Sequence, residues 1–508
     1  MNDHGGSLMV FESLEPKLVW EIFEEVFTKT PRGSKKEDKI REKLKSWIPE
    51  RATSLGMKIE VIEDKAGNLL IKKGPTKGME AAQPLLLQGH MDMVCETDRP
   101  DGFDFENNSI PIRIQENGEW VDADGTTLGA DNGIGVSLCL ALMLDPKVRH
   151  GPLELLITVD EETGLVGAFA LEPKNMGITS KLMMNIDSET LEVITIGSAG
   201  GGDLELTKKI ELREVTGDIT FFNLTVSGLF GGHSGVDIHK HRANSNKVAA
   251  RLLSSLVAEM NLHLCNWNGG SKHNAIAREA TVKFAVESNK SKRVEELLTG
   301  VRKVLKTYYK ELEPDMQVNW DKSSSEPAFS LEESKRIIQS INILPHGPIR
   351  FSPNVDGLVE TSNNVAIIKT GASEVYVLLS TRSSVDSELE AFRNSIVDLA
   401  ELSGWQITKK PGYPGWNPEP KSPFLSFVRK HFENVTGREV KVEAIHAGLE
   451  CGIIGSKIPG IQMVSIGPTL ENPHTPDERL RIIDVEILFN VLKEIVEDLP
   501  NMKKLVLR

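Results

Sequence analysis

The chain has few features that would tie it to a nucleic acid, to a membrane or to an oxidising compartment. Its four cysteines are scattered among 508 residues without the C-x-x-C spacing of a thiolate metal site. The formal net charge of −14 argues against nucleic acid and against membranes as partners, since both are bound through basic surfaces. Few, unpaired cysteines suit a reducing compartment, and we therefore expect a cytoplasmic protein.

Long apolar runs are also missing. The most apolar segment, 136–144 (VSLCLALML), is about half as long as a membrane-spanning helix, and we expect it to form a buried helix. The first residues, MNDHGGSLMVFESLEPK, lack the basic and apolar regions of a secretory signal.

The order of predicted elements indicates a two-part architecture. A chain of 508 residues is long enough for two or three domains. Apolar strand-like and helix-like segments alternate early in the chain, which favours an α/β fold with a mostly parallel sheet. Further on, alternating strands and amphipathic helices indicate an inserted α+β domain, and the Pro- and Gly-rich segment 409–423 looks like the return. We expect catalytic parts at 1–200 and 412–508 and an inserted lid at 201–411.

Acidic residues and histidines follow the short apolar runs. In open α/β sheets, ligands bind at the carboxyl ends of the strands, so these side chains would gather at one sheet edge. Imidazole and carboxylate together suit Zn²⁺, Mn²⁺ or Co²⁺. The apolar runs lead into His90 and Asp92, Glu161 and Glu162, Asp187, and His474.

Each residue also has an ordinary explanation when taken alone. Adjacent glutamates such as Glu161 and Glu162 are common on surfaces, although at a strand end they would face opposite sides and serve a metal and a water. Asp131, in the turn GADNG, would make a normal helix N-cap. A lone histidine such as His90 is more often structural. The combination of motifs is what argues for chemistry.

Together the motifs resemble the M20 family of metallopeptidases, in its cytosolic non-specific dipeptidase branch. The resemblance runs nearly end to end, through FTKTPRGSKKEDKIREKL (27–44), LLLQGHMDMVCE (85–96), HAGLECG (446–452) and GPTLENPHTPDERL (467–480). It implies a di-metal catalytic domain, with an inserted domain that serves as lid and dimerisation domain, and therefore a homodimer.

The resemblance implies two divalent metal ions per subunit, with Zn²⁺ as the first expectation and Mn²⁺ or Co²⁺ as alternatives. Asp131 would bridge the two ions, and its peptide bond to Asn132 would be cis. Each ion would then keep a coordination position for water, as catalytic sites do. The remaining ligands would be His90 and Asp187 for one ion, and Glu162 and His474 for the other.

The family also assigns catalytic roles. Glu161 would act as general base, taking a proton from the water and returning it to the leaving amine. Asp92 would fix the imidazole of His90 from behind. His233, in the motif GGHSG of the inserted domain, would reach across a dimer interface and stabilise the oxyanion of the tetrahedral intermediate.

Substrate recognition is assigned to four residues. A guanidinium can hold a carboxylate with two hydrogen bonds, so Arg382 would bind the dipeptide C-terminus, although a surface ion pair explains this arginine nearly as well. Asn274 would contact substrate from the lid. His446 and Glu450 are four residues apart, which would align them on a helix. The role of Glu450 stays open between binding the substrate amine and supporting other residues.

The predicted activity is hydrolysis of unblocked dipeptides, including Xaa-His and β-alanyl-histidine. One alternative is an N-acyl-amino-acid deacylase of the same family, which would not require a free α-amine. The other is a catalytically inactive relative that acts as a binding protein. Retention of all the expected ligands together with Glu161 weighs against the second alternative.

Overall fold

The computed structural model describes residues 9–502 and divides the chain into two compact units. Residues 1–8, which include the start of the segment judged to lack a secretory signal, and 503–508 lie outside it. The first unit takes in the chain up to Gly197, Pro418–Ala444 and the chain from Leu449; the second consists of Ser198–Asn417 and Ile445–Gly448. Their assignment as catalytic and lid domains stays a prediction.

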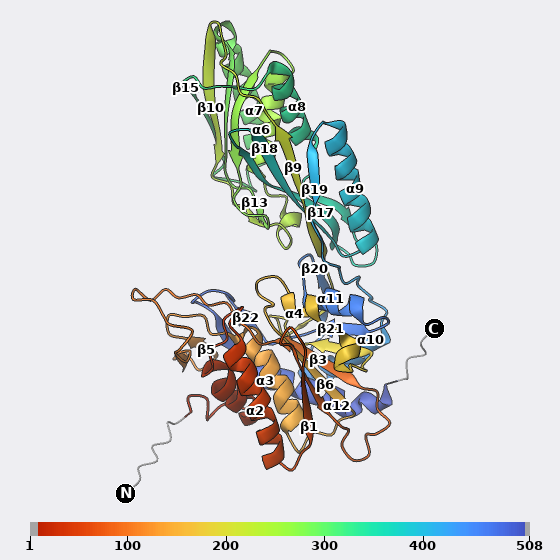
Figure 1. The fold of residues 1–508 in the computed structure, drawn as a ribbon. Helices are drawn as coiled ribbons and strands as arrows, with labels where there is room; N and C mark the ends of the chain where they lie inside the picture. Colours follow the sequence, from red (N-terminus) through yellow and green to blue (C-terminus); the bar gives the residue numbers. More distant parts are fainter. Residues whose placement is uncertain (1–8, 503–508) are drawn as a thin grey trace. The chain divides into compact units, whose positions relative to one another are not determined.

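The first unit is built on an eight-stranded sheet (Figure 1). The pairs β6-β3, β3-β7 and β7-β21 are parallel, and the pairs β1-β2, β2-β6 and β21-β8 are antiparallel. Among these six pairs, the mostly parallel pairing expected from the sequence therefore holds for the centre of the sheet alone. The strands in sheet order are β1 (Ile59–Glu63), β2 (Leu69–Lys73), β6 (Leu153–Thr158), β3 (Leu85–His90), β7 (Leu182–Asn185), β21 (Gln462–Ser465), β8 (Val193–Ser198) and β20 (Lys441–Ile445).

The strands β3, β6 and β7 are buried along their whole length, as their continuous apolar sequences require. Helices α3 and α10 pack against this sheet, and α12 packs on both helices (Figure 1). The helices of this unit are α1 (Lys17–Ile22), the π-helix η1 (Phe23–Thr28), α2 (Asp38–Ser54), α3 (Ala130–Leu144), α4 (Val166–Ala170), α5 (Pro173–Met176), α10 (Pro423–Thr436), α11 (Glu450–Lys457), α12 (Ile482–Asp498) and the 3₁₀ turn η4 (Leu499–Asn501). Segment 136–144 is buried within α3, as predicted.

A second, four-stranded sheet in the first unit carries the late histidine motif. Its strands are β22 (Leu470–Glu471), β23 (Arg479–Arg481), β5 (Trp120–Ala123) and β4 (Ile112–Ile114). β22 and β23 pair antiparallel, so the chain between them forms a connecting turn. His474 lies in this turn.

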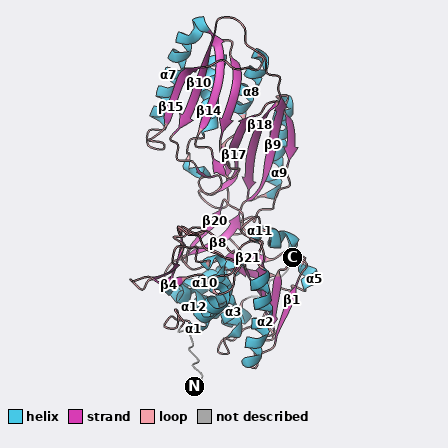
Figure 2. Cartoon of the chain, turned by 60° about the vertical axis from the view of Figure 1, so that its left-hand side comes forward, coloured by secondary structure: helices cyan, strands magenta, loops and turns pink. Residues whose placement is uncertain are grey.

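The second unit is α+β, with a nine-stranded sheet whose pairs are antiparallel and helices packed on it (Figure 2). The strands in order are β15 (Gln317–Ser323), β10 (Ile219–Ser227), β14 (Ala280–Glu287), β12 (His263–Gly269), β17 (Val359–Thr370), β18 (Glu374–Ser383), β9 (Gly200–Lys209) and β19 (Gln406–Lys409), with β16 (Gly347–Phe351) on β17. The helices are α6 (Ser245–Val257), α7 (Ser291–Tyr308), α8 (Leu331–Ile343) and α9 (Asp386–Leu402), with 3₁₀ turns η2 (Ile238–Lys240) and η3 (Ser288–Lys290); β11 (Gly232–His233) and β13 (Ala275–Ile276) form a separate small pair. The α/β fold with an inserted α+β part is therefore confirmed.

Between residues 9 and 502 the structure contains no helix that is both long and apolar enough to cross a membrane.

Candidate metal centre

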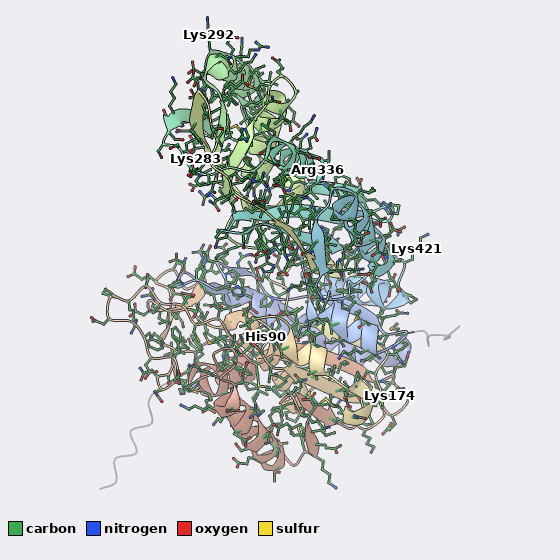
Figure 3. All side chains as sticks on the ribbon, turned by 45° about the horizontal axis from the view of Figure 1, so that its top comes forward. His90, Lys174, Lys283, Lys292, Arg336 and Lys421 are labelled. Carbon is green, nitrogen blue, oxygen red and sulfur yellow. The ribbon has the colours of Figure 1, made fainter. Side chains whose placement is uncertain are left out.

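The predicted residues of the first unit come together where parallel strands end. His90, labelled in Figure 3, is the last residue of β3, and Asp187 follows the end of β7 by two residues. Glu161 and Glu162 do not continue a strand as expected, because β6 ends at Thr158 and the glutamates lie in the turn that follows. The expectation of opposite strand faces is therefore wrong, although the pair still reaches the same edge of the sheet.

Asp131 lies at the start of α3, and its peptide bond to Asn132 is cis, as the resemblance predicts. The N-cap position of this helix is occupied by Gly129, which has no side chain to cap it. The Asp131 carboxylate instead faces two histidines, with Oδ1 3.0 Å from His90 Nε2 and Oδ2 3.0 Å from His474 Nε2. A simple N-cap role does not describe this residue.

Two groups of metal-type donors share the Asp131 carboxylate. In the first group, His90 Nε2 also lies 3.4 Å from Asp187 Oδ1. In the second group, His474 Nε2 also lies 3.1 Å from Glu162 Oε2. Within each group the donor atoms lie within 4.8 Å of one another, a spacing at which one cation can contact them all.

The charges of this cluster fit a bound cation. Glu162 Oε1 and Asp187 Oδ1 are buried without a hydrogen-bond partner. Burial raises the pKa of Asp187 to about 7, and the neighbouring carboxylates of Asp131 and Glu162 add to the shift. Buried carboxylates at this distance repel one another unless a positive charge lies between them. The nitrogen and oxygen donors therefore fit divalent ions on either side of Asp131.

Glu161 and Asp92 lie beside these donors. A carboxylate oxygen of Glu161 lies within 4.8 Å of the donor atoms of His90 and Glu162. Burial raises the pKa of Glu161 well above the ordinary value, and the nearby carboxylates of Asp187 and Glu450 add to this shift. The Asp92 carboxylate accepts hydrogen bonds from the backbone N–H groups of Glu161 (3.0 Å) and Glu162 (3.3 Å), and its Oδ1 lies 3.3 Å from His90 Nδ1. Asp92 thus joins the glutamate turn to the histidine.

Glu450 is buried in the first unit, at the start of α11. Its Oε2 accepts hydrogen bonds from Thr158 Oγ1 (2.8 Å) and Gln88 Nε2 (2.5 Å), which belong to β6 and β3. These are the strands that lead into the glutamate turn and into His90. The contacts favour support of the metal centre, the second of the two roles left open by the sequence.

The other predicted residues gather in the second unit. His233 in β11 pairs with Ala275 in β13, and Asn274 directly precedes that strand. His233 Nδ1 accepts hydrogen bonds from the N–H groups of Gly235 and Val236, both at 3.2 Å. The ring proton therefore sits on Nε2, which becomes a donor. Burial lowers the pKa of His233 to about 4, and the charge of Arg382 adds to this, so the ring is neutral at neutral pH.

Arg382 and His446 lie near each other in this unit. Arg382 on β18 is opposite Ser362 on β17, whose hydroxyl is 2.7 Å from His446 Nε2. Arg382 Nη1 donates to the hydroxyl of Tyr413 at 3.0 Å, and Nε is buried without a partner. The expectation that His446 and Glu450 share a helix is wrong, because α11 begins at Glu450 and His446 precedes it in an irregular segment.

The sequence did not predict two buried charged residues near the candidate metal centre. Arg32 lies in the segment 27–44 and Glu478 in the segment 467–480, both of which carried the resemblance. Their side chains bind backbone groups rather than other side chains. A hydrogen bond to a distant backbone leaves no spacing pattern in a sequence, so only their presence in the motifs hinted at a role.

Comparison with known proteins gives a consistent family. Residues 224–313 match the family described as peptidase dimerisation domain. The chain is 36% identical over 488 residues, 96% of its length and 98% of the relative's, to the cytosol non-specific dipeptidase of Escherichia coli (strain K12). Its structure matches that of the aminoacylhistidine dipeptidase from Vibrio alginolyticus with a TM-score of 0.89 and 36% identity over 100% of both chains.

A more distant match shares the fold alone. An M20 family metallo-carboxypeptidase from Sulfolobus solfataricus aligns with a TM-score of 0.53 and 14% identity, over 95% of this chain and 99% of that one. The end-to-end matches at 36% identity identify the family itself. The chain belongs to the M20 family of metallopeptidases, among the relatives of the cytosol non-specific dipeptidases.

Proposed function

We propose that this protein is a metal-dependent dipeptidase that hydrolyses unblocked dipeptides, Xaa-His and β-alanyl-histidine among them. The observation that carries the proposal is the sharing of Asp131 between two donor groups, with Glu161 beside them. Its relatives include a non-specific dipeptidase and an aminoacylhistidine dipeptidase, which supports the substrate class.

The metal centre would hold two divalent ions, most simply Zn²⁺, with Mn²⁺ or Co²⁺ as alternatives. The imidazole and carboxylate donors support this choice, and the described cysteines are free and contribute no ligand to the donor groups. Such ions would polarise a peptide carbonyl and lower the pKa of a water molecule, so that the water can be deprotonated and act as the nucleophile at neutral pH. The first ion would be held by His90, Asp131 and Asp187, and the second by Asp131, Glu162 and His474.

The residues of the chain carry out the proton transfers. Glu161 takes the proton from the attacking water and delivers it to the leaving amine, a role that its raised pKa supports. Asp92 keeps Glu161 in place through the backbone N–H groups of the turn, and it orients the ring of His90.

The second unit would supply the contacts to the substrate. His233 Nε2–H would donate to the oxyanion, and its neutral state, with the proton fixed on Nε2, supports this role. Arg382 would bind the C-terminal carboxylate of the dipeptide, with Asn274 and His446 as further contacts. The match to a peptidase dimerisation domain supports a homodimer in which His233 serves the partner's catalytic centre.

We place the protein in the cytoplasm. Its four cysteines are free within the described residues, which is compatible with a reducing compartment. The relative from Escherichia coli is named a cytosol enzyme, which supports the same location.

A substrate panel tests the proposal. The protein is reconstituted with Zn²⁺, Mn²⁺ or Co²⁺ and assayed on dipeptides, tripeptides and N-acyl amino acids. We expect cleavage of dipeptides with a free α-amine and little cleavage of the other two classes. Activity confined to N-acyl amino acids would show that the protein is a deacylase and not a dipeptidase. The absence of activity on the whole panel would favour the catalytically inactive binding relative.

A further inference from the structure

Arg32 and Glu478 are buried ionic residues that the proposed mechanism does not use. Each is 1% exposed. They hold opposite sides of one turn, 128–131, which leads into α3 and ends on the proposed bridging ligand Asp131. Burying a charge is costly unless it is fully hydrogen-bonded, so the contacts of these two side chains show what they accomplish.

Glu478 binds the N–H side of the turn. Its Oε2 accepts from the N–H groups of Leu128 (2.8 Å) and Gly129 (2.9 Å), and its Oε1 from those of Ala130 (2.8 Å) and Asp131 (3.3 Å). These N–H groups belong to the turn that leads into the continuous part of α3, because Asp131 and Asn132 have non-helical backbone angles. One carboxylate thereby holds the turn that carries Asp131 from more than 300 residues away in the chain.

Glu478 belongs to the same turn as His474. Its own N–H donates to the carbonyl oxygen of Thr475 at 3.0 Å, which closes the turn between β22 and β23. The turn therefore contacts segment 128–131 twice. Glu478 binds its backbone, and His474 binds the carboxylate of Asp131 at 3.0 Å.

Arg32 binds the carbonyl side. Its Nη2 donates to the carbonyl oxygen of Gly129, and its Nη1 donates to those of Met91 (3.1 Å) and Asp92 (2.9 Å). Its Nε donates to the carbonyl oxygen of Phe27 at 3.1 Å. Arg32 thus ties the turn that follows His90 to the turn that precedes Asp131.

The close approach of Arg32 constrains Gly129. A Cβ atom at this position would lie 2.5 Å from Arg32 Nη2, and Gly129 has a φ of +71°. Both facts require glycine in a turn held from two sides, because other residues would clash and be strained. The turn is therefore held on both of its sides by contacts within the chain.

We propose that Glu478 and Arg32 are positioning residues that fix the turns bearing His90, Asp131 and His474 relative to one another before metal binds. Metal affinity, more than fold stability, should then depend on them. This inference rests on the proposed metal centre, and it adds two residues that contact neither metal nor substrate.

The test uses the full-length chain, stripped of metal and titrated with Zn²⁺ against a chromophoric chelator. Glu478→Gln keeps the size of the side chain but replaces one acceptor oxygen by an NH₂ group, which faces N–H donors. We expect zinc affinity to fall about 10–100-fold, the usual effect of losing a residue that orients a metal ligand. Glu471→Gln is the matched control, because Glu471 lies in β22 close to the same turn, is 43% exposed and pairs with Arg479; the zinc affinity of this variant should stay at the wild-type value.

Circular dichroism and the melting temperature of the metal-free proteins separate positioning from folding. Glu478→Asp, which keeps the charge, should recover part of the zinc affinity, and Arg32→Lys should lose affinity as Glu478→Gln does. If a folded Glu478→Gln binds zinc as tightly as wild type, the inference is overturned. It is equally overturned if both Glu478 variants fail to fold, since Glu478 is then a folding residue. Wild-type protein that binds no divalent metal would instead overturn the proposed function.

Discussion

Glu161→Gln is the sharpest test of the proposed chemistry. The substitution is nearly isosteric and leaves the backbone N–H of residue 161 free to donate to Asp92, so the turn should keep its shape. Glutamine cannot accept the proton of the attacking water. General acid–base catalysis contributes about 10²–10⁴-fold, so kcat on a dipeptide should fall by that factor, or about 3–5 kcal/mol in activation free energy. Zinc content should stay at the wild-type value, because Glu161 is not a proposed ligand.

Two glutamine variants control this experiment. Glu162→Gln alters a proposed ligand and should lose both zinc and activity, whereas Glu172→Gln, on the exposed surface of the same unit, should change neither. Zinc content is measured by elemental analysis after gel filtration, and kcat by release of free amino acid. Near-normal turnover in Glu161→Gln would remove Glu161 from the mechanism, and loss of zinc in that variant would make it a ligand.

Three further predictions concern the metal, the dimer and pH. Chelation of the divalent metal should lower the melting temperature reversibly, since a ligand at 100 times its Kd stabilises a protein by about 2.7 kcal/mol; an unchanged melting temperature after verified metal removal would contradict the proposed centre. Mixing inactive Glu161→Gln with inactive His233→Ala under subunit exchange should restore activity, because the heterodimer has one centre with both native residues; verified heterodimers without any gain would place His233 in its own subunit or outside catalysis. Burial and the charge of Arg382 lower the pKa of His446 to about 3, so below about pH 6.5 the unfolded chain binds a proton that the folded chain does not, and stability is lost as the pH falls. His446→Gln should remove about 1.6 kcal/mol of the decrease in unfolding free energy between pH 6.5 and 5, measured by urea denaturation, and an unaltered pH dependence would refute this assignment.

The gathering of His90, Asp187 and the glutamate pair at one sheet edge could be predicted because it depends on a general rule of α/β sheets. The proposed ligand roles, and the inclusion of Asp131 and His474 among the ligands, came from the family resemblance. Apolar runs identified β3, β6 and β7, and parallel neighbours bring the residues at their carboxyl ends together. The rule needs only the strands and their direction. It does not need the conformation of the turns, and for this reason it placed Glu161 and Glu162 at the correct edge even though it assigned them to the strand itself.

Arg32 and Glu478 could not be predicted in the same way. Both bind backbone groups of Gly129, which lies 97 positions from Arg32 and 349 positions from Glu478 in the sequence. Any residue type has a backbone N–H and a carbonyl, so such partners leave no trace in composition, periodicity or spacing. Glutamate and arginine are usually solvated, and on sequence alone both would have been placed at the surface.

The motif HAGLECG illustrates why closeness in sequence does not establish a shared role. Ile445–Gly448 belongs to the second compact unit, where the N–H of Ala199 donates to the carbonyl oxygen of Ala447 at 2.9 Å and His446 contacts Ser362. Glu450, only four residues after His446, begins a helix of the first unit and binds β3 and β6. The spacing of four residues suggested that both side chains lie on one helix face, but the two residues belong to different compact units. Each residue takes its chemistry from the unit that buries it: His446 lies beside Arg382, and Glu450 binds the strands that lead into the proposed metal ligands.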